Sequence, residues 1–210
     1  MNQHQAFVLL LAVVMGSMAA PATRADDTGF YVLGSIGRSN IGANNTAVDN
    51  YNLSHGFASS FTATNDHDTG YKAQLGYRFG TWAIEGGYTD LGRSGFTSTT
   101  DLGTYAGDFR AKLGNLDLVG MFPAGQHFIL LAKVGGYYWE STSNMPSPAG
   151  GTMSVDDNGW DFKFGAGVQY NFNEHFGLRA EFERFNGVGD SNTSGDSKVN
   201  LMSAGAVLKF

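Results

Sequence analysis

Apolar and polar residues alternate along most of the chain, and the alternation is most regular over residues 160–172. There the even-numbered positions are all apolar or aromatic, whereas the odd-numbered positions are polar, charged or glycine. A period of two residues predicts a β-strand with one apolar and one polar face. The stretch is also long enough for a tilted strand to cross a lipid bilayer.

The same alternation recurs and predicts eight strands in total. They are expected at residues 30–38, 71–79, 82–90, 105–122, 128–139, 160–172, 176–185 and 199–210. Short turns at 80–81, 123–126 and 173–174 alternate with long loops at 40–67, 92–103, 141–157 and 187–197. Short turns on one rim and long loops on the other are typical of outer-membrane barrels. We therefore predict an all-β fold, namely an eight-stranded antiparallel up-and-down transmembrane β-barrel.

In such a barrel the apolar set of each strand faces lipid and the polar set faces the lumen. The sheet must close, because the unpaired backbone groups of an open edge would face hydrocarbon. Aromatic residues are expected in two bands at the membrane interfaces, with Trp82, Phe128, Tyr170 and Phe172 near the short turns and Tyr138 and Trp160 near the long loops. Asp108, Arg110 and Lys112 are in the outward phase, so we place that part of the chain beyond the lipid.

Acidic and basic residues gather on the inward faces of the expected strands. This candidate lumenal ion network consists of Glu85, Lys133, Arg179, Glu181, Lys72 and Asp117. Three acids and three bases make it nearly neutral, and pairing offsets the cost of burying charge. We expect Glu85 to pair with Arg179, and Lys133 with Glu181. The network either gates a small pore or forms a polar plug that fixes strand register, and the plug is favoured because the interior of a small barrel is normally filled.

The N-terminus has the pattern of an export signal. An apolar run is followed by small residues, so residues 1–25 are expected to be a cleaved signal peptide and residues 26–210 the barrel domain. Cleavage after Ala22 is the alternative to cleavage after Ala25. Removal of Arg24 leaves 12 basic and 19 acidic residues, which does not support a nucleic-acid partner.

The histidines do not form a convincing catalytic or metal site. His127 and His175 are expected at short turns without a serine on the same face, although nucleophilic hydrolysis needs that pairing. His55 and His67 fall in the first long loop, where a preorganised triad is not expected. One histidine between Asp66 and Asp68 is not a metal signature. No catalytic residues, metal or cofactor are therefore predicted.

Five segments resemble the N-terminal transmembrane barrel of the outer membrane protein A family. They are residues 85–93 (EGGYTDLGR), 133–139 (KVGGYYW), 167–170 (GVQY), 178–182 (LRAEF) and 201–210 (LMSAGAVLKF). The order and spacing of these motifs together carry the similarity, which spans about residues 28–210.

The resemblance implies a monomeric eight-stranded barrel with a lumenal ion network. Glu85, Lys133, Arg179 and Glu181 match network positions of that family, whereas its second pair appears here as the neutral Val119 and Gln169. The family's periplasmic peptidoglycan-binding domain is not expected in this chain. The closing residues Ala206, Leu208 and Phe210 look like the signal that is read by the outer-membrane assembly machinery.

The expected function is structural or surface-interacting rather than enzymatic. The partners would be outer-membrane lipid and lipopolysaccharide, the assembly machinery, and an extracellular ligand bound through the four long loops, since loops on rigid scaffolds often carry recognition. A narrow porin-like channel with a gated lumen is the alternative. A lipid A-modifying enzyme and a soluble periplasmic barrel are the remaining ones.

Overall fold

A computed structural model describes residues 28–42, 53, 60–65, 67–101, 103–146, 152–188 and 197–210. Nine strands cover most of these residues. They are β1 (Thr28–Gly42), β2 (Ser60–Asn65), β3 (His67–Phe79), β4 (Trp82–Thr100), β5 (Gly103–Ala124), β6 (Phe128–Pro146), β7 (Thr152–Asn171), β8 (Phe176–Val188) and β9 (Ser197–Lys209). The expected signal peptide and residue His55 lie outside the described residues. In the described part, no helix has the length and apolar character needed to cross a membrane.

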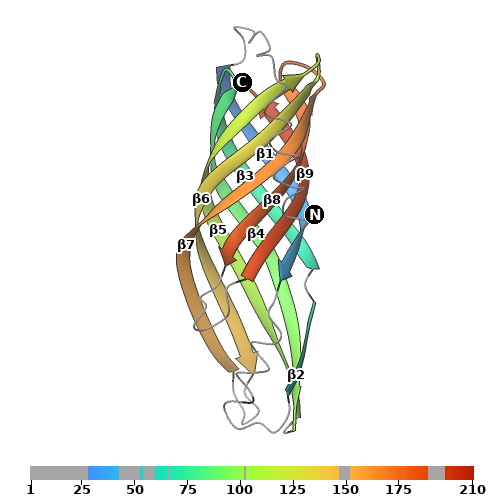
Figure 1. The fold of residues 1–210 in the computed structure, drawn as a ribbon, viewed down its shortest axis with the longest axis vertical. Coiled ribbons are helices and arrows are strands. Elements are labelled where there is room, and N and C mark those ends of the chain that lie inside the picture. Colours follow the sequence, from blue (N-terminus) through green and yellow to red (C-terminus); the bar gives the residue numbers. More distant parts are fainter. Residues whose placement is uncertain are drawn as a thin grey trace, which may run out of the picture.

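Eight of the strands close into an antiparallel barrel, which confirms the predicted fold (Figure 1). The order around it is β1-β3-β4-β5-β6-β7-β8-β9, and β9 pairs with β1 to complete the ring. The backbone N–H of Phe210 donates to the carbonyl of Phe30 at 2.9 Å and extends this seam to the rim. Closure leaves no sheet edge in the part that faces lipid.

The short turns lie at one rim, together with the start of β1 and the end of β9. The turn at 80–81 joins Phe79 directly to its ladder partner Trp82. Gly80 has a φ of 70°, and the described residues include no non-glycine residue with positive φ. A positive φ at the first central residue alone is the pattern of a type II′ hairpin turn, which glycine accommodates without strain.

Two of the predicted long loops are wrong in part, because strands occupy most of them. β4 and β5 continue to the pair Thr100–Gly103, so only residues 101–102 remain of the predicted loop 92–103. β6 and β7 pair as far as Pro146–Thr152, which leaves 147–151 of the predicted loop 141–157. Beyond the membrane the backbone still gains from ladder hydrogen bonds, but the apolar alternation that reveals a strand disappears. The two long hairpins form the lower end of Figure 1.

The predicted loop 40–67 also contains an unexpected strand. β2 pairs with the outer half of β4, from Ser60–Thr100 to Asn65–Gly95, and continues the line of β3. The register of β4 shifts between Asp90 and Arg93. Gly92 within this bulge has a φ of 83°. Leu91 continues the odd-numbered inward phase of β4 and is fully buried, whereas beyond the bulge Ser94 is the next buried residue.

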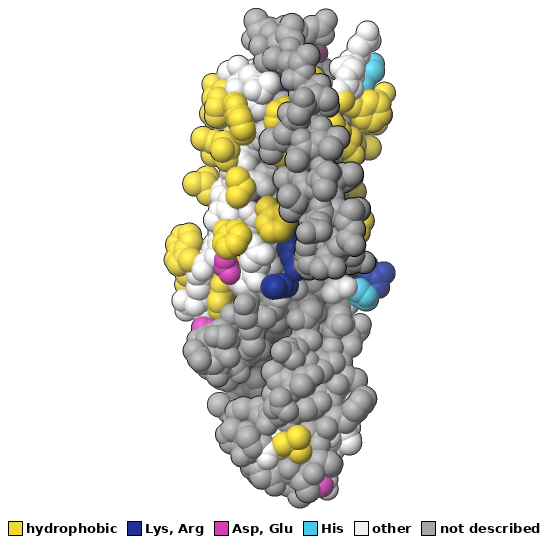
Figure 2. All heavy atoms as spheres, viewed as in Figure 1, with side chains coloured by type: hydrophobic (Ala, Val, Ile, Leu, Met, Phe, Trp, Pro, Cys, Tyr) yellow, Lys and Arg dark blue, Asp and Glu magenta, His cyan; other side chains and the backbone are white. Residues whose placement is uncertain are grey.

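Apolar side chains cover the outside of the barrel and charged side chains lie within it. Phe162 is 58% exposed, whereas Glu85 is 0% and Arg179 is 2% exposed. Leu130, Phe164 and Leu208 are also exposed. Figure 2 shows apolar atoms, in yellow, over the upper part of the face in view, and the exposed apolar residues of all the barrel strands form an apolar belt. This is the sidedness of a transmembrane barrel and the reverse of that of a soluble one.

The described residues form two separate apolar clusters in the interior. The inner cluster, on the side of the short turns, consists of Tyr31, Leu33, Ala83, Val119, Met121, Ile129, Leu131 and Val207. The outer cluster, on the side of the long hairpins, consists of Leu91, Ala111, Leu113, Tyr137, Trp139, Phe185, Val188, Val199 and Leu201. The buried charges lie along the strands between them.

Candidate functional site

Eight charged side chains meet inside the barrel and form what we call the ion layer. Its members come from six strands, β3 to β8, and are Lys72, Glu85, Asp117, Lys133, Lys163, Arg179, Glu181 and Glu183. Four are acids and four are bases, so the layer is neutral. Each is at most 5% exposed. Burial on this scale is costly unless every charge is paired.

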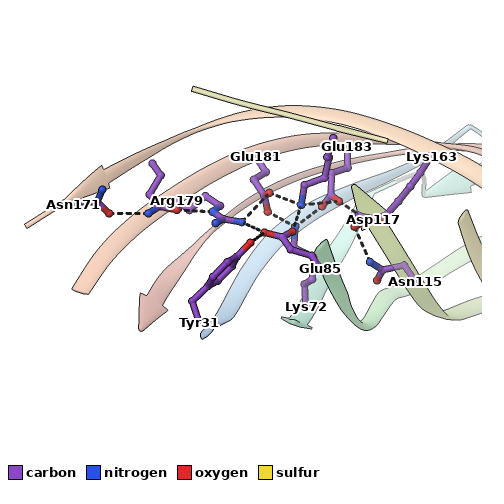
Figure 3. A network of polar contacts seen from close by, with 12 residues as sticks. Tyr31, Lys72, Glu85, Asn115, Asp117, Lys163, Asn171, Arg179, Glu181 and Glu183 are labelled. Atoms are coloured by element: carbon purple, nitrogen blue, oxygen red, sulfur yellow. Dashed lines mark hydrogen bonds and ion pairs between the residues drawn. The ribbon is translucent and has the colours of Figure 1, made fainter. Parts of the chain in front are cut away.

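Glu85 on β4 lies at the centre of one half of the ion layer (Figure 3). Its carboxylate accepts hydrogen bonds from Lys133 Nζ at 2.8 Å, from Tyr31 Oη at 2.6 Å and from Arg179 Nη1. The guanidinium of Arg179 also lies over the Tyr31 ring, 5.3 Å from its centroid. The three donors come from β1, β6 and β8, so this carboxylate links opposite walls of the barrel.

Glu183 on β8 organises the other half. Lys163 Nζ lies 2.7 Å from Glu183 Oε1 and 2.9 Å from Asp117 Oδ2. Lys72 Nζ donates to both Glu181 and Glu183. Lys133 Nζ lies 2.6 Å from Glu181 Oε1 and therefore connects the two halves. The result is one continuous set of ion pairs across the lumen.

Glycines in the neighbouring strands make room for these long side chains. A Cβ atom at Gly135 would lie 2.1 Å from Asp117 Oδ1, and one at Gly76 would lie 2.2 Å from Tyr31 Cζ. Ladder pairs place Gly165 opposite Glu183 and Gly167 opposite Glu181. The inward glycines of the sequence pattern are therefore a packing requirement of the ion layer.

Polar side chains extend the network at both ends. Arg179 Nε donates to Gln169 Oε1 at 2.9 Å, and Gln169 Nε2 donates to Asn171 Oδ1 at 2.7 Å. At the other end, Asn115 Nδ2 donates to Asp117 Oδ2 at 2.8 Å. Some buried side-chain atoms near the layer have no partner among the described residues, including both polar atoms of Gln74 and the Oδ1 of Asn115.

The structure brings all six predicted network residues together. Glu85 pairs with Arg179 and Lys133 pairs with Glu181. Lys163, Glu183 and Tyr31 belong to the network in addition to the six predicted residues. Lys163 and Glu183 lie in the inward phase of their strands, which is the signal that could have identified them. Both residues lie farther along the chain from their short turns than Glu85 does, but in a barrel of tilted strands they reach the same set of ion pairs.

The predicted interface aromatics all lie on the outside or at the rims. Tyr170 has its ring centroid 5.0 Å from those of Phe128 and Phe172 near the short turns. Tyr138 and Trp160 are ladder partners with centroids 5.2 Å apart at the opposite end of the belt. Trp82 is exposed beside the first short turn.

The three residues proposed for assembly recognition share the outward face of the last strand. Ala206, Leu208 and Phe210 are all exposed. Their side chains are therefore accessible from the lipid side.

The histidines within the described residues are scattered. His67 is exposed at the start of β3, and His175 is exposed in a turn. His127 Nδ1 lies 3.0 Å from the carbonyl oxygen of Asn171. No group of three or more metal-binding side chains occurs in the part of the chain that the structure describes.

The chain matches one protein family over nearly its full length and resembles named bacterial proteins. The model of the "Outer membrane protein beta-barrel domain" family matches residues 8–210. Outer membrane protein A of Shigella flexneri is 28% identical over 160 residues, which are 74% of this chain and 44% of that protein. The chain thus spans less than half the length of this relative.

Solved structures support the same fold. The outer membrane protein OprG from Pseudomonas aeruginosa superposes with a TM-score of 0.55 at 15% identity, covering 88% of this chain and 97% of that one. Neisserial surface protein A superposes with a TM-score of 0.54 at 16% identity, covering 87% of this chain and 97% of that one.

Proposed function

This chain belongs to the outer membrane protein beta-barrel domain family, and from that premise we propose that it is a sealed, lipid-embedded scaffold that displays its long hairpins outside the bacterial cell. Its location is the outer membrane, as the family and the relatives named outer membrane protein A indicate. The function that we assign is structural support and surface interaction, without catalysis.

The observation that carries the proposal is the filling of the lumen. The ion layer lies between the inner and outer apolar clusters, so a solute would have to cross two apolar regions and one set of paired charges. The ion pairs join six of the eight barrel strands. Breaking them to admit a solute would leave buried charges unpaired, which is strongly unfavourable.

The length of the outer hairpins supports the display role. β5 has 22 residues and β7 has 20, whereas a tilted strand needs about 9–11 to cross a bilayer. The excess extends beyond the apolar belt on the long-loop side only. A rigid support that holds extended hairpins away from the membrane is suited to contact with other molecules.

Cysteine labelling in intact cells tests the display role, because the chain contains no native cysteine. Asp101→Cys places a thiol at the tip of the β4–β5 hairpin, and Glu174→Cys places one in a short turn. A membrane-impermeant maleimide should label the first variant in intact cells and the second only after permeabilisation. The opposite result would invert the barrel and overturn the proposal.

A narrow channel is the second candidate, and the buried polar atoms without partners support it. Those of Gln74 and Asn115 lie beside the ion layer and would suit water in the lumen. Planar-bilayer recording of the wild type, Glu85→Ala and Arg179→Ala separates the two functions. Steady conductance in the wild type would favour the channel, whereas silence in all three proteins agrees with a sealed scaffold.

Mass spectrometry of lipid A from cells with and without the protein should show no difference if the protein is not a lipid A-modifying enzyme.

The mass of the mature protein should correspond to loss of residues 1–25, and a mass that retains residues 23–25 would instead place cleavage after Ala22. An intact N-terminus would refute the export signal.

A further inference from the structure

Three basic side chains occupy one sector of the outer wall, at the edge of the apolar belt. We call them the outer basic cluster: Arg38 on β1, Arg184 on β8 and Lys198 on β9. They belong to the outward phase of their strands, and Arg38 and Lys198 are exposed. The chain as a whole has a net charge of −6, so a basic sector does not follow from its composition.

Strand register gathers the three bases around one residue. Asn200 on β9 pairs with Arg184 on one side and with Asn40 on the other. Arg38 pairs with Met202, which makes it the diagonal neighbour of Asn200, and Lys198 is the next outward residue along β9. Adjacent and diagonal positions on one sheet face lie within reach of long side chains.

The outer basic cluster has no acidic partner among the described residues. The bases on the opposite wall differ in this respect. Arg110 Nη2 lies 2.6 Å from Asp90 Oδ2, and Arg93 Nε lies 3.6 Å from Asp108 Oδ2. Lys112 is the ladder partner of Glu140. Bases at a similar height are therefore matched with acids over β4 to β6 but not over β8, β9 and β1.

An apolar surface adjoins the outer basic cluster on the membrane side. Met202 is the ladder partner of both Arg38 and Phe182, and Met202, Phe182 and Ile36 are all exposed on the same three strands. Figure 2 shows lysine and arginine atoms, in dark blue, where the yellow belt ends. Cations at a membrane interface attract anionic headgroups, and the apolar wall beside them is available to acyl chains.

We propose that β8, β9 and β1 form a binding site for a phosphorylated glycolipid of the outer leaflet, of the lipid A type. Arg38, Arg184 and Lys198 would bind its phosphates, and the acyl chains would lie along Ile36, Phe182 and Met202. In the cell this assignment rests on the proposed outward display of the long hairpins. Binding to the purified protein does not depend on that orientation, so the two proposals can fail separately.

The test is binding of diphosphoryl lipid A to the purified, folded barrel in nanodiscs of zwitterionic lipid. The triple variant Arg38→Gln/Arg184→Gln/Lys198→Gln should bind on the order of a hundredfold more weakly, since each base near an anionic lipid contributes roughly fivefold. The matched control Arg93→Gln/Arg110→Gln/Lys112→Gln removes the same charge from the opposite wall. Because these three bases lie on the opposite wall, this control variant should change the affinity for lipid A by less than about threefold.

Two further measurements decide the source of the phosphate. Lipid A without phosphates should bind the wild type as weakly as diphosphoryl lipid A binds the triple variant. Inorganic phosphate should not displace bound lipid A, and displacement would assign the cluster to soluble anions. Heat-modifiable gel migration verifies that each variant is folded. Equal losses in the triple variant and the control, or no loss in either, would overturn the site.

Discussion

Removal of the Glu85 carboxylate is the most informative perturbation of the ion layer. Glu85→Gln keeps the shape of the side chain but deletes one of four buried acids, which leaves the layer with one excess positive charge. Lys133 still has Glu181 at 2.6 Å, but the nearest remaining carboxylate to Arg179 is Glu181 at 3.7 Å. The variant therefore leaves the buried Arg179 guanidinium poorly paired.

The magnitude follows from this imbalance. Removal of one partner of a buried ion pair costs about 3–5 kcal/mol, because an uncompensated charge stays in a medium of low polarity. The single variant should lower the free energy of unfolding by roughly that amount. Arg179→Gln should also destabilise the barrel. The double variant restores neutrality, so it should be more stable than the sum of the two effects by about 1–3 kcal/mol.

The assay is reversible urea unfolding from lipid vesicles, followed by tryptophan fluorescence, for all four proteins of this double-mutant cycle. The control cycle uses Asp90→Asn and Arg110→Gln, whose side chains pair at 2.6 Å on the exposed outer wall. Solvent screens that pair, so its coupling should be much smaller. Additive effects at Glu85 and Arg179 would refute the view that the ion layer acts as a balanced unit.

Three further changes test the packing of the barrel by the same unfolding assay. Gly76→Ala should destabilise the barrel by about 1–3 kcal/mol, because the new Cβ meets the Tyr31 ring. In the control Gly86→Ala the new Cβ has no neighbour closer than 3.8 Å, so this change should be tolerated. Equal effects of the two changes would contradict the packing role of Gly76. Val134→Arg on the exposed apolar belt should lower the free energy of unfolding by about 2–4 kcal/mol. Thr142→Arg, farther along the same strand and beyond the belt, should lower it by about 0–1 kcal/mol. Equal effects would show that the bilayer does not end between these two residues. Tyr31→Phe removes a 2.6 Å hydrogen bond to Glu85 and should cost about 1.5–3 kcal/mol, and an unchanged stability would show that this bond contributes nothing.

The sequence predicts the membrane-spanning part of the barrel well, because lipid and lumen impose opposite requirements on successive residues. All eight expected strands occur, and Phe162 and Leu208 point outward as the alternation indicates. The short turn at 80–81 is also correct, since its glycine adopts the positive φ that the hairpin needs. Where one face must be apolar, a period of two residues is visible in the sequence.

Outside the bilayer this requirement disappears, and the predictions fail there. The outer half of β4 has water on its outward face, so serine, threonine and glycine occur without alternation and resemble a loop. The bulge between Asp90 and Arg93 also reverses the phase, so the inward position passes from odd-numbered residues such as Leu91 to the even-numbered Ser94. Lys163 and Glu183 are missing from the predicted network for another reason. Strand tilt decides which inward residues of neighbouring strands meet, and it cannot be determined from distances along the chain.

The apolar faces of the strands contact lipid, while their other faces fill the lumen. The three tryptophans test it directly, because Trp82 is 45% exposed and Trp160 79% exposed on the outer wall, whereas Trp139 is 5% exposed inside. Each would be kept alone, with the other two changed to phenylalanine, in vesicles whose acyl chains carry bromine near the headgroup. Bromine should quench Trp82 and Trp160 but not Trp139. Quenching of Trp139, with Trp82 and Trp160 unaffected, would show that the faces of the strands are reversed.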